Sequence, residues 1–244
     1  MPYIVLAPSV AASFIYVFVF TGWTLYISLS NSTLLPTYGF VGLDNYVSLF
    51  QNRRWNVAYT NLFLFSGFYV LGSIVVGLLL AILIDQRVRA ESAWRTFFLY
   101  PLAVSFIVSG IVWRWMFNPD LGIQGFLRGL GWESASFNWL ADPRTAMYGI
   151  ILASIWHGLG FYMALMLAGL KSINSEIWSA ARLDGVSFWR LYIEIIVPMM
   201  KFTFLTCAIL LSLGVVKAFD IIVAMTNGGP GTSTWTPAFF TINA

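Results

Sequence analysis

Few side chains in this sequence could carry out chemistry. It contains one histidine, His157, and one cysteine, Cys207, which excludes an internal disulfide and a metal site of clustered thiolates. Three acids, Glu176, Asp184 and Glu194, fall in one segment with no histidine beside them. A membrane enzyme would need a nucleophile with its base, or paired acids, grouped at one depth. The sequence therefore predicts no catalytic site, no metal site and no cofactor.

The sequence also lacks the usual means of driving a solute uphill. No glycine is followed directly by lysine, so the Gly-x-x-x-x-Gly-Lys-Ser/Thr loop that binds nucleotide phosphates is absent. The run from Asn227 to Gly231 is a turn by its chemistry. An ion-driven carrier would place ionisable groups deep in its spans, and the apolar stretches have no carboxylate near their middle. These features predict a membrane pathway without its own energy source.

Four residues are candidates for contact with a transported solute: Trp156, His157, Lys217 and Asp220. His157 falls about ten residues into an apolar stretch, about 15 Å deep at the helical rise, where an ionisable side chain is a functional candidate. Its ring and that of Trp156 suit a sugar, although a neutral histidine bonded to a neighbouring helix would give the same pattern. Lys217 and Asp220 are three positions apart, so we expect them to pair on one helical face near the outer end rather than to bind solute.

Arg114 stands between two tryptophans, Trp113 and Trp115. At the helical rise it lies about 27 Å from the inner end of its apolar stretch. We expect its charged group to reach the outer interface while the neighbouring rings cover its stem. A part in gating is the less favoured alternative.

The composition indicates that these residues are held in a lipid bilayer. Of 244 residues, 59% are apolar and 9% are charged, and the mean hydropathy is +0.79. Soluble domains carry about 25% charged residues, so disordered tails, nucleic-acid-binding modules and small disulfide scaffolds are excluded. The excess of Lys+Arg over Asp+Glu, 13 against 10, is too small to indicate a polyanionic partner.

Five stretches are apolar over the length that a membrane-spanning helix needs, about 20 residues. They cover residues 3–30, 61–84, 96–117, 147–170 and 195–225. A sixth begins at Pro237 and reaches Ala244, so we expect an incomplete sixth helix. No basic stretch precedes the first span, which disfavours a signal peptide. The predicted fold is all-α: a polytopic membrane protein with five complete transmembrane helices plus the start of a sixth, in one domain, 1–244.

Basic residues indicate the orientation of the spans, because lysine and arginine near span ends are retained in the cytoplasm. We place segments 85–95 and 171–201 inside, and 31–60 and 118–146 outside, with the N-terminus inside. The inner segments carry Arg87, Arg89, Arg95, Lys171, Arg182, Arg190 and Lys201. The outer segments are longer, yet they carry only Arg53, Arg54, Arg128 and Arg144.

The inner segment 175–190 is predicted to form two short helices hinged at Gly185. Ser175 can cap the first helix, and Glu176 suits its positive end. Ala180 and Ala181 are expected to form a small-residue face that a partner could approach closely. Further apolar anchors are Trp178, Leu183, Phe188 and Trp189, and Pro198 suits the first turn of the following span. The pattern indicates a docking surface; the alternative is a solvated loop that joins two spans.

These residues resemble a family pattern. Ser179-Ala-Ala, Asp184-Gly185 and Ile195-Ile-Val-Pro198 closely resemble the EAA loop of permease subunits from bacterial binding-protein-dependent ABC importers. Lys217-Ala-Phe-Asp220, Thr226-Asn-Gly-Gly-Pro230 and Val41-Gly-Leu-Asp-Asn-Tyr46 resemble the carbohydrate branch, the relatives of the maltose importer's larger permease. One departure is that Ser179 stands where the acid that names the motif is expected.

The resemblance implies how the chain is coupled to ATP. Residues 171–198 would form the cytoplasmic coupling loop, whose short helix sits in a cleft of a cytoplasmic ATPase. The coupling residues would be Ser179, Ala180, Ala181, Arg182, Leu183, Asp184 and Gly185, followed by Pro198. ATP hydrolysis would belong to a separate ATPase dimer, so this chain would not itself be an enzyme.

The resemblance also implies the other partners and the solute. We expect a second permease of similar architecture, an extracytoplasmic sugar-binding protein that contacts segments 31–60 and 118–146, and a location in the bacterial cytoplasmic (inner) membrane. The first outer loop resembles those of glucose or mannose importers, while maltose-like, trehalose-like or glycerol-phosphate solutes stay open. The rival hypothesis is an autonomous secondary carrier or channel that needs no ATPase.

Overall fold

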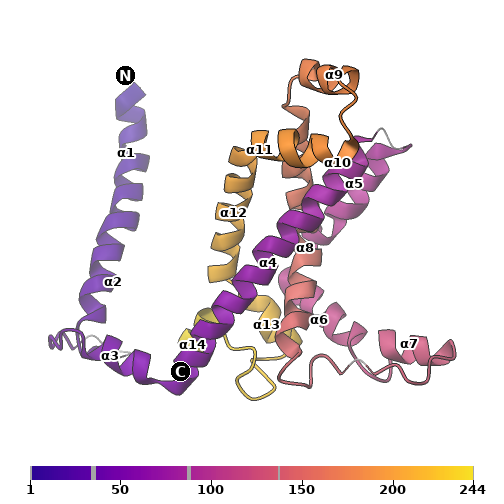
Figure 1. Ribbon diagram of the computed structural model, residues 1–244. Coiled ribbons are helices and arrows are strands. Elements are labelled where there is room, and N and C mark those ends of the chain that lie inside the picture. The colour runs from indigo at the N-terminus through magenta and orange to yellow at the C-terminus, as the bar shows by residue number, and fades with distance from the viewer. Residues whose placement is uncertain (1, 34–36, 87–88, 137, 244) are drawn as a thin grey trace. The chain divides into compact units, whose positions relative to one another are not determined.

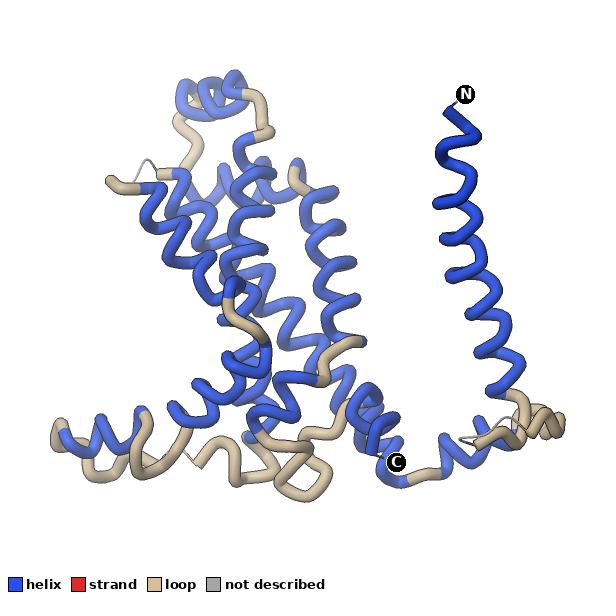
Figure 2. The backbone as a smooth tube through the Cα atoms, turned by 180° about the vertical axis from the view of Figure 1, so that it is seen from behind, coloured by secondary structure: helices blue, strands red, loops and turns tan. Residues whose placement is uncertain are grey.

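The computed structural model describes residues 2–33, 37–86, 89–136 and 138–243. The chain forms two compact units, Met1–Asn56 and Val57–Ala244, which are described separately. The described residues are helices and loops, without a strand, and a single antiparallel bridge joins Ser30 to Phe40 (Figure 2). The predicted all-α class is confirmed.

The N-terminal unit is built around one long helix. It runs through α1 (Pro2–Phe14), a π-helical turn (Ile15–Val19) and α2 (Phe20–Ser28), and Leu6–Ser28 is apolar over 23 residues without a buried side chain. An apolar helix exposed all round is typical of a membrane span. The Asn45 amide then donates to the carbonyls of Ser28 and Ser30, at 3.0 and 2.8 Å. These bonds fasten α3 (Asp44–Gln51) to the end of α2.

The larger unit is organised around α8 (Ala146–Lys171), most of whose residues are buried (Figure 1). It is crossed by α4 (Arg53–Asp85) and by α5 (Glu91–Leu99). A Cβ atom at Gly77 of α4 would lie 3.3 Å from backbone atoms of α8, and one at Gly160 of α8 would lie 2.1 Å from the Phe98 carbonyl oxygen. Small residues at these crossings let helices approach closely, as is usual in membranes.

The third predicted span, 96–117, is bent rather than straight. A 3-10 turn (Tyr100–Ala103) follows α5, and α6 (Phe106–Met116) leaves it at an angle of 99°. Pro101 lies in this turn and lacks an N–H to continue an α-helix. The Ser105 side chain then accepts a hydrogen bond from the Val108 N–H at 3.3 Å and caps the new helix.

The fifth predicted span, 195–225, is wrong as a single helix. The chain passes through α10 (Phe188–Arg190), a π-helical segment (Leu191–Ile196) and α11 (Val197–Met199), and then bends by 69° into α12 (Lys201–Val216). Pro198 lies in the first turn of α11, as predicted. A second break after Val216 separates α12 from α13 (Asp220–Met225), and α14 (Pro237–Asn243) is the predicted start of a sixth helix.

In the described part of the chain, three long apolar helices and two bent pairs give up to five spans by length and composition. Within the larger unit, the start of α5 and the loop carrying α9 (Ser175–Leu183) lie at one end, and α7 (Ile123–Gly129) lies at the other (Figure 1). Glu91 pairs with Arg95, and with Lys171 at 3.1 Å. The two basic segments predicted to share a side therefore meet at one end; Arg87 lies outside the described residues.

Candidate functional site

The helix α9 carries most of the predicted docking residues and begins one position earlier than predicted. The Asn174 side-chain oxygen accepts a hydrogen bond from the Glu176 N–H at 3.0 Å. Asn174 has extended backbone angles, φ −56° and ψ 132°, whereas Ser175 is already helical. Asn174 is thus the N-cap, and the prediction of Ser175 as the cap is wrong. Glu176 lies in the first turn as expected, where its negative charge interacts favourably with the positive end of the helix dipole.

The end of α9 confirms the hinge predicted at Gly185. The Val186 N–H donates to the Ala181 carbonyl at 3.0 Å, and the Gly185 N–H donates to the Arg182 carbonyl at 3.3 Å. This pair of bonds is the Schellman pattern, which needs a left-handed residue after the helix. Gly185 supplies it with φ +65°, and a Cβ there would meet nothing within 4 Å. The glycine is therefore required by backbone conformation and not by crowding.

The outer face of α9 differs from the predicted small-residue face. Ala180 is exposed, but Ala181 is 5% exposed and belongs to the hydrophobic core. Neighbouring residues point about 100° apart around an α-helix, so the two alanines cannot share one face. Glu176, Ser179, Ala180 and Leu183 are exposed and lie on one side of α9, here called the docking face. Leu183 is 88% exposed, more than any other large apolar side chain among the described residues.

The other predicted anchors divide between the two sides of the loop. Trp178 and Phe188 pack against Tyr192, with ring centroids 5.8 and 4.7 Å away. The Gln86 side chain, just after α4, donates to the Tyr192 hydroxyl at 3.3 Å. Trp189 instead is 69% exposed. The loop is thus fastened to the end of α4 by its inner rings, while Leu183 and Trp189 remain outside.

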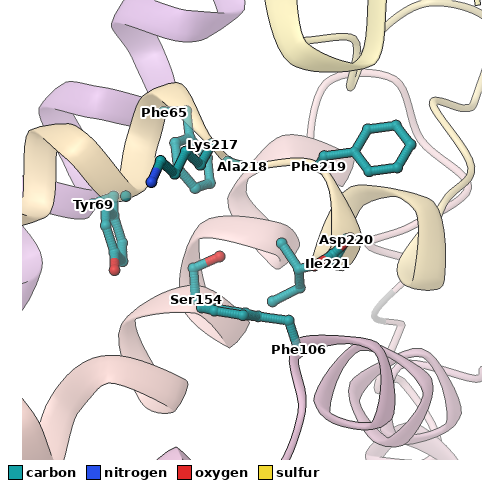
Figure 3. Close-up of a pocket in the computed structure, with 10 residues that line it drawn as sticks. Phe65, Tyr69, Phe106, Ser154, Lys217, Ala218, Phe219, Asp220 and Ile221 are labelled. Carbon is teal, nitrogen blue, oxygen red and sulfur yellow. The ribbon is translucent and has the colours of Figure 1, made fainter. Parts of the chain in front are cut away.

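A cavity of about 310 Å³ lies among the transmembrane helices. Figure 3 shows that its side chains come from α4, α6 and α8, from the break between α12 and α13, and from the start of α13. Aromatic rings, two hydroxyls and two charged groups face one space. Its lining residues are Phe65, Tyr69, Phe106, Ser154, Gly214, Lys217, Ala218, Phe219, Asp220 and Ile221. Such a mixture offers apolar faces together with hydrogen-bond donors and acceptors.

Lys217 and Asp220 both line this cavity, but the predicted pairing between them is wrong. Among the described residues, the ion pairs join Glu91 to Arg95 and Lys171, and Arg190 to Glu194. The helix ends between the two predicted partners: Lys217 follows α12, and Asp220 is the first residue of α13. The spacing of three residues therefore does not bring the side chains onto one helical face.

The break between α12 and α13 is held by its surroundings. The Thr236 hydroxyl donates to the Ala218 carbonyl at 3.1 Å, and the Phe219 ring lies 6.0 Å from that of Phe239. The Asn61 amide donates to the Ser233 and Trp235 carbonyls, each at 2.9 Å. Irregular backbone within a membrane is tolerated where it is buried in protein or lines an aqueous cavity. In transporters such breaks are where solutes are bound.

His157 does not line the cavity but lies behind its wall. The side chain is 3% exposed, and its Nδ1 atom lies 3.0 Å from the Ser109 hydroxyl of α6. Its ring stacks on Phe106 with centroids 3.9 Å apart. Trp156 packs edge-on against Trp113 at 5.7 Å. The arrangement found for His157 is the alternative in which the histidine is bonded to a neighbouring helix.

Of the cavity residues, sequence reasoning proposed Lys217 and Asp220 and missed the other eight. Four of those eight lie on α4, α6 and α8: Phe65, Tyr69, Phe106 and Ser154. Three are aromatic residues in spans rich in such rings, so nothing in their type marked them. The Tyr69 hydroxyl in the middle of an apolar helix was the one usable signal, because a buried phenol usually finds a partner or a ligand.

The comparisons with known proteins agree with this architecture. Over residues 73–243, more than half of its length, the chain matches the family described as the binding-protein-dependent transport system inner membrane component. The chain belongs to this family. A probable ABC transporter permease protein of Pyrococcus horikoshii is 39% identical to this permease, over 96% of the present chain and 82% of that relative. The trehalose/maltose transport system permease protein MalF of Thermococcus litoralis is 29% identical, over 99% of this chain and 82% of that relative.

Among solved structures, the permease shares its fold with a bacterial ABC transporter involved in the import of the acidic polysaccharide alginate. The TM-score is 0.81 at 21% sequence identity, over 98% of this permease and 81% of that chain. The family match includes α9 and the break between α12 and α13, but it begins after Phe65 and Tyr69. The permease therefore has its loop and most of its cavity within the part that defines the family.

Proposed function

We propose that this permease is a membrane subunit of an ATP-driven sugar importer. It forms half of the translocation pathway and couples to a cytoplasmic ATPase dimer through the 175–190 loop. The observation that carries the proposal is the docking face of α9, where Leu183 is 88% exposed on a helix fixed at both ends by local hydrogen bonds. A rigid helix that presents an isolated exposed leucine suits insertion into a groove on a partner.

The loop is connected to the cavity through packed side chains. Force on α9 would pass from Trp178 to the Tyr192 ring and from the Tyr192 hydroxyl to Gln86 at the end of α4. The same α4 carries Phe65 and Tyr69 into the cavity. A rotation or shift of α4 would therefore change the shape of the cavity wall, which is the kind of rigid-body transmission that packed helices permit.

The cavity supports a sugar as the solute. Phe65, Tyr69 and Phe106 supply ring faces for the apolar C–H face of a sugar, and Ser154, Lys217 and Asp220 can donate to or accept from its hydroxyls. A relative is named for trehalose and maltose transport, which agrees with a sugar. Within this class we propose a monosaccharide of the glucose or mannose kind. Delivery by an external binding protein accords with the family description.

The proposed assembly contains three further kinds of chain: the ATPase dimer, a second permease of similar architecture and the external solute-binding protein. With the 85–95 and 171–201 segments in the cytoplasm, the N-terminus is also cytoplasmic. The opposite end of the larger unit then faces the binding protein.

The test compares two substitutions of leucine in the complete transporter, purified from source membranes through a tag on this chain. Leu183→Asp is expected to lower the amount of copurifying ATPase about tenfold or more, because a leucine side chain that becomes buried contributes about 1.5–3 kcal/mol. Leu130→Asp is the matched control, since Leu130 is 69% exposed in the predicted outer segment. It should leave the ATPase bound.

Transport is then measured in vesicles that contain ATP, with radiolabelled glucose, mannose, maltose, trehalose or glycerol 3-phosphate outside together with the binding protein. The proposal expects ATP-dependent uptake of a sugar, with glucose or mannose preferred, and its loss with Leu183→Asp. Normal ATPase recovery with Leu183→Asp would overturn the docking assignment. Solute flux in vesicles that contain this chain alone would instead identify an autonomous carrier.

A further inference from the structure

A second hollow, of about 340 Å³, is lined by segments of the larger unit. Figure 1 shows these segments at the end of that unit opposite α9. It is formed where the end of α6 and the loop that follows it meet residues 138–141, which precede α8, and the turn after α13. The helices α6 and α13 pack directly against each other below it. Its lining residues are Arg114, Phe117, Asn118, Pro119, Asn138, Leu140, Ala141, Met225, Thr226, Gly229 and Pro230. This group is called the Arg114 pocket below.

The charge in the Arg114 pocket is not balanced by the chain itself. Arg114 is the only ionisable residue among those that line it, and it takes part in none of the ion pairs of the described residues. The Asn118 side-chain oxygen accepts from the N–H groups of Asp120 and Leu121, at 2.9 and 3.1 Å. Its amide nitrogen, like the Asn138 side chain, has no hydrogen bond within the described part of the chain. The pocket thus offers one cation and two amides to a ligand.

The walls of the pocket are built before any ligand arrives. The Trp113 ring beside Arg114 is 9% exposed and lies 5.3 Å from the Phe117 ring. In the turn, the Asn227 N–H donates to the Ile222 carbonyl at 2.9 Å, and the Gly229 N–H donates to the Thr226 carbonyl at 3.0 Å. A site whose walls are already held in place loses little conformational entropy when it binds a ligand.

We propose that the Arg114 pocket receives an aspartate or glutamate side chain of the external solute-binding protein. The inference rests on the proposed function, because it needs this end to face the binding protein. A carboxylate has the charge and the acceptor atoms that a guanidinium and two amides recognise. Three loop segments form the rim, and exposed loop backbone is not tolerated in the hydrocarbon of a bilayer. The mouth therefore lies outside the hydrocarbon, at the end that the proposed function turns toward the binding protein.

The experiment measures ATP hydrolysis by the reconstituted transporter as its solute-loaded binding protein is titrated. Arg114→Glu is expected to raise the concentration for half-maximal stimulation about tenfold or more, because repulsion replaces attraction. The maximal rate should stay unchanged, and Arg114→Lys should fall between the two. Arg89→Glu is the matched control: Arg89 is exposed in the predicted inner segment 85–95 and does not line the pocket. It should change the value by less than about twofold.

Several outcomes separate the alternatives. A single Asp→Lys or Glu→Lys change in the binding protein that restores stimulation of the Arg114→Glu transporter would identify the carboxylate and confirm the proposal. An unchanged titration with Arg114→Glu would overturn it and leave the proposed function standing. Loss of the second permease on purification of Arg114→Glu would overturn it in favour of an internal contact. An effect that disappears when anionic lipid is replaced by phosphatidylcholine would overturn it in favour of an anionic lipid headgroup. A wild-type transporter that no binding protein stimulates would overturn the proposed function as well.

Discussion

His157 supports a cavity wall that it does not itself form. Its imidazole lies between the Ser109 hydroxyl and the Phe106 ring, and Phe106 faces the cavity. We predict that His157→Ala raises the KM for the transported sugar about two- to tenfold, since a stacked aromatic pair contributes about 0.5–1.5 kcal/mol. The maximal ATPase rate should change little. The measurement is uptake at graded sugar concentrations by the reconstituted transporter.

Two further variants distinguish a positioning role from direct contact with the sugar. His157→Phe keeps a ring behind Phe106 and should recover most of the lost affinity, whereas Ser109→Ala should weaken binding in the same direction but by less. If His157→Phe were as poor as His157→Ala, the nitrogen atoms rather than the ring would matter. An unchanged KM in all variants would contradict the prediction.

At the scale of single residues, the sequence identifies side chains whose burial in a bilayer is energetically unfavourable, and it does not identify small polar side chains. His157 was recognisable because burying an unpaired ionisable ring in a bilayer costs free energy. The orientation of its ring, however, depends on Ser109, 48 positions away. Ser154 gave no signal, because a serine in a helix can satisfy its hydroxyl locally. Its hydroxyl donates to the Ile150 carbonyl at 2.8 Å. A small polar residue can therefore line a cavity without any pattern in the sequence that predicts this position.

The element α9 presents adjacent alanines in different directions, which gives a sharp test of the docking face. In a Cys207→Ser background, Ala180→Cys should react rapidly with a water-soluble maleimide when the ATPase is removed, and be protected when it is bound. Ala181→Cys should react slowly in both states, because Ala181 is 5% exposed. Labelling is followed by mass spectrometry. Equal labelling of Ala180→Cys with and without the ATPase would contradict docking through this face.

Short elements with local end signals could be predicted, and long spans with turns could not. The hinge at Gly185 follows from one glycine with φ +65°, and Pro198 marked the start of α11. The bends of 99° and 69° were missed because mean hydropathy measures how apolar a stretch is and carries no information on direction. Ser105, which caps α6, was a usable signal inside the third span.

At the scale of the whole molecule, the distribution of lysine and arginine predicted which segments meet, whereas only Lys217 and Asp220 of the cavity residues were among the candidates. Glu91 forms ion pairs with Arg95 and Lys171, which belong to the two basic segments. The content of lysine and arginine therefore indicates which segments lie at the same end. The cavity depends on the break after Val216, where three residues leave the helix between two apolar segments. Thr236, 18 positions beyond Ala218, holds that break. A contact of this range is not encoded in local periodicity.

The break between α12 and α13 leads to a prediction about the assembled transporter. Lys217 and Asp220 are both exposed in the single chain and do not pair with each other. A charged group without a protein partner in a membrane must be hydrated, so we expect both to border an aqueous pathway shared with the second permease.

In a Cys207→Ser background, Lys217→Cys and Asp220→Cys should react with a charged, water-soluble thiol reagent, and saturating sugar should slow the reaction. Ile209→Cys is the control, because Ile209 is 53% exposed on the apolar surface of α12 and should stay unlabelled against lipid or a helix. Labelling of Ile209→Cys as fast as Lys217→Cys would show that water reaches the helix without a defined pathway, and the assignment of the cavity to solute passage would fail.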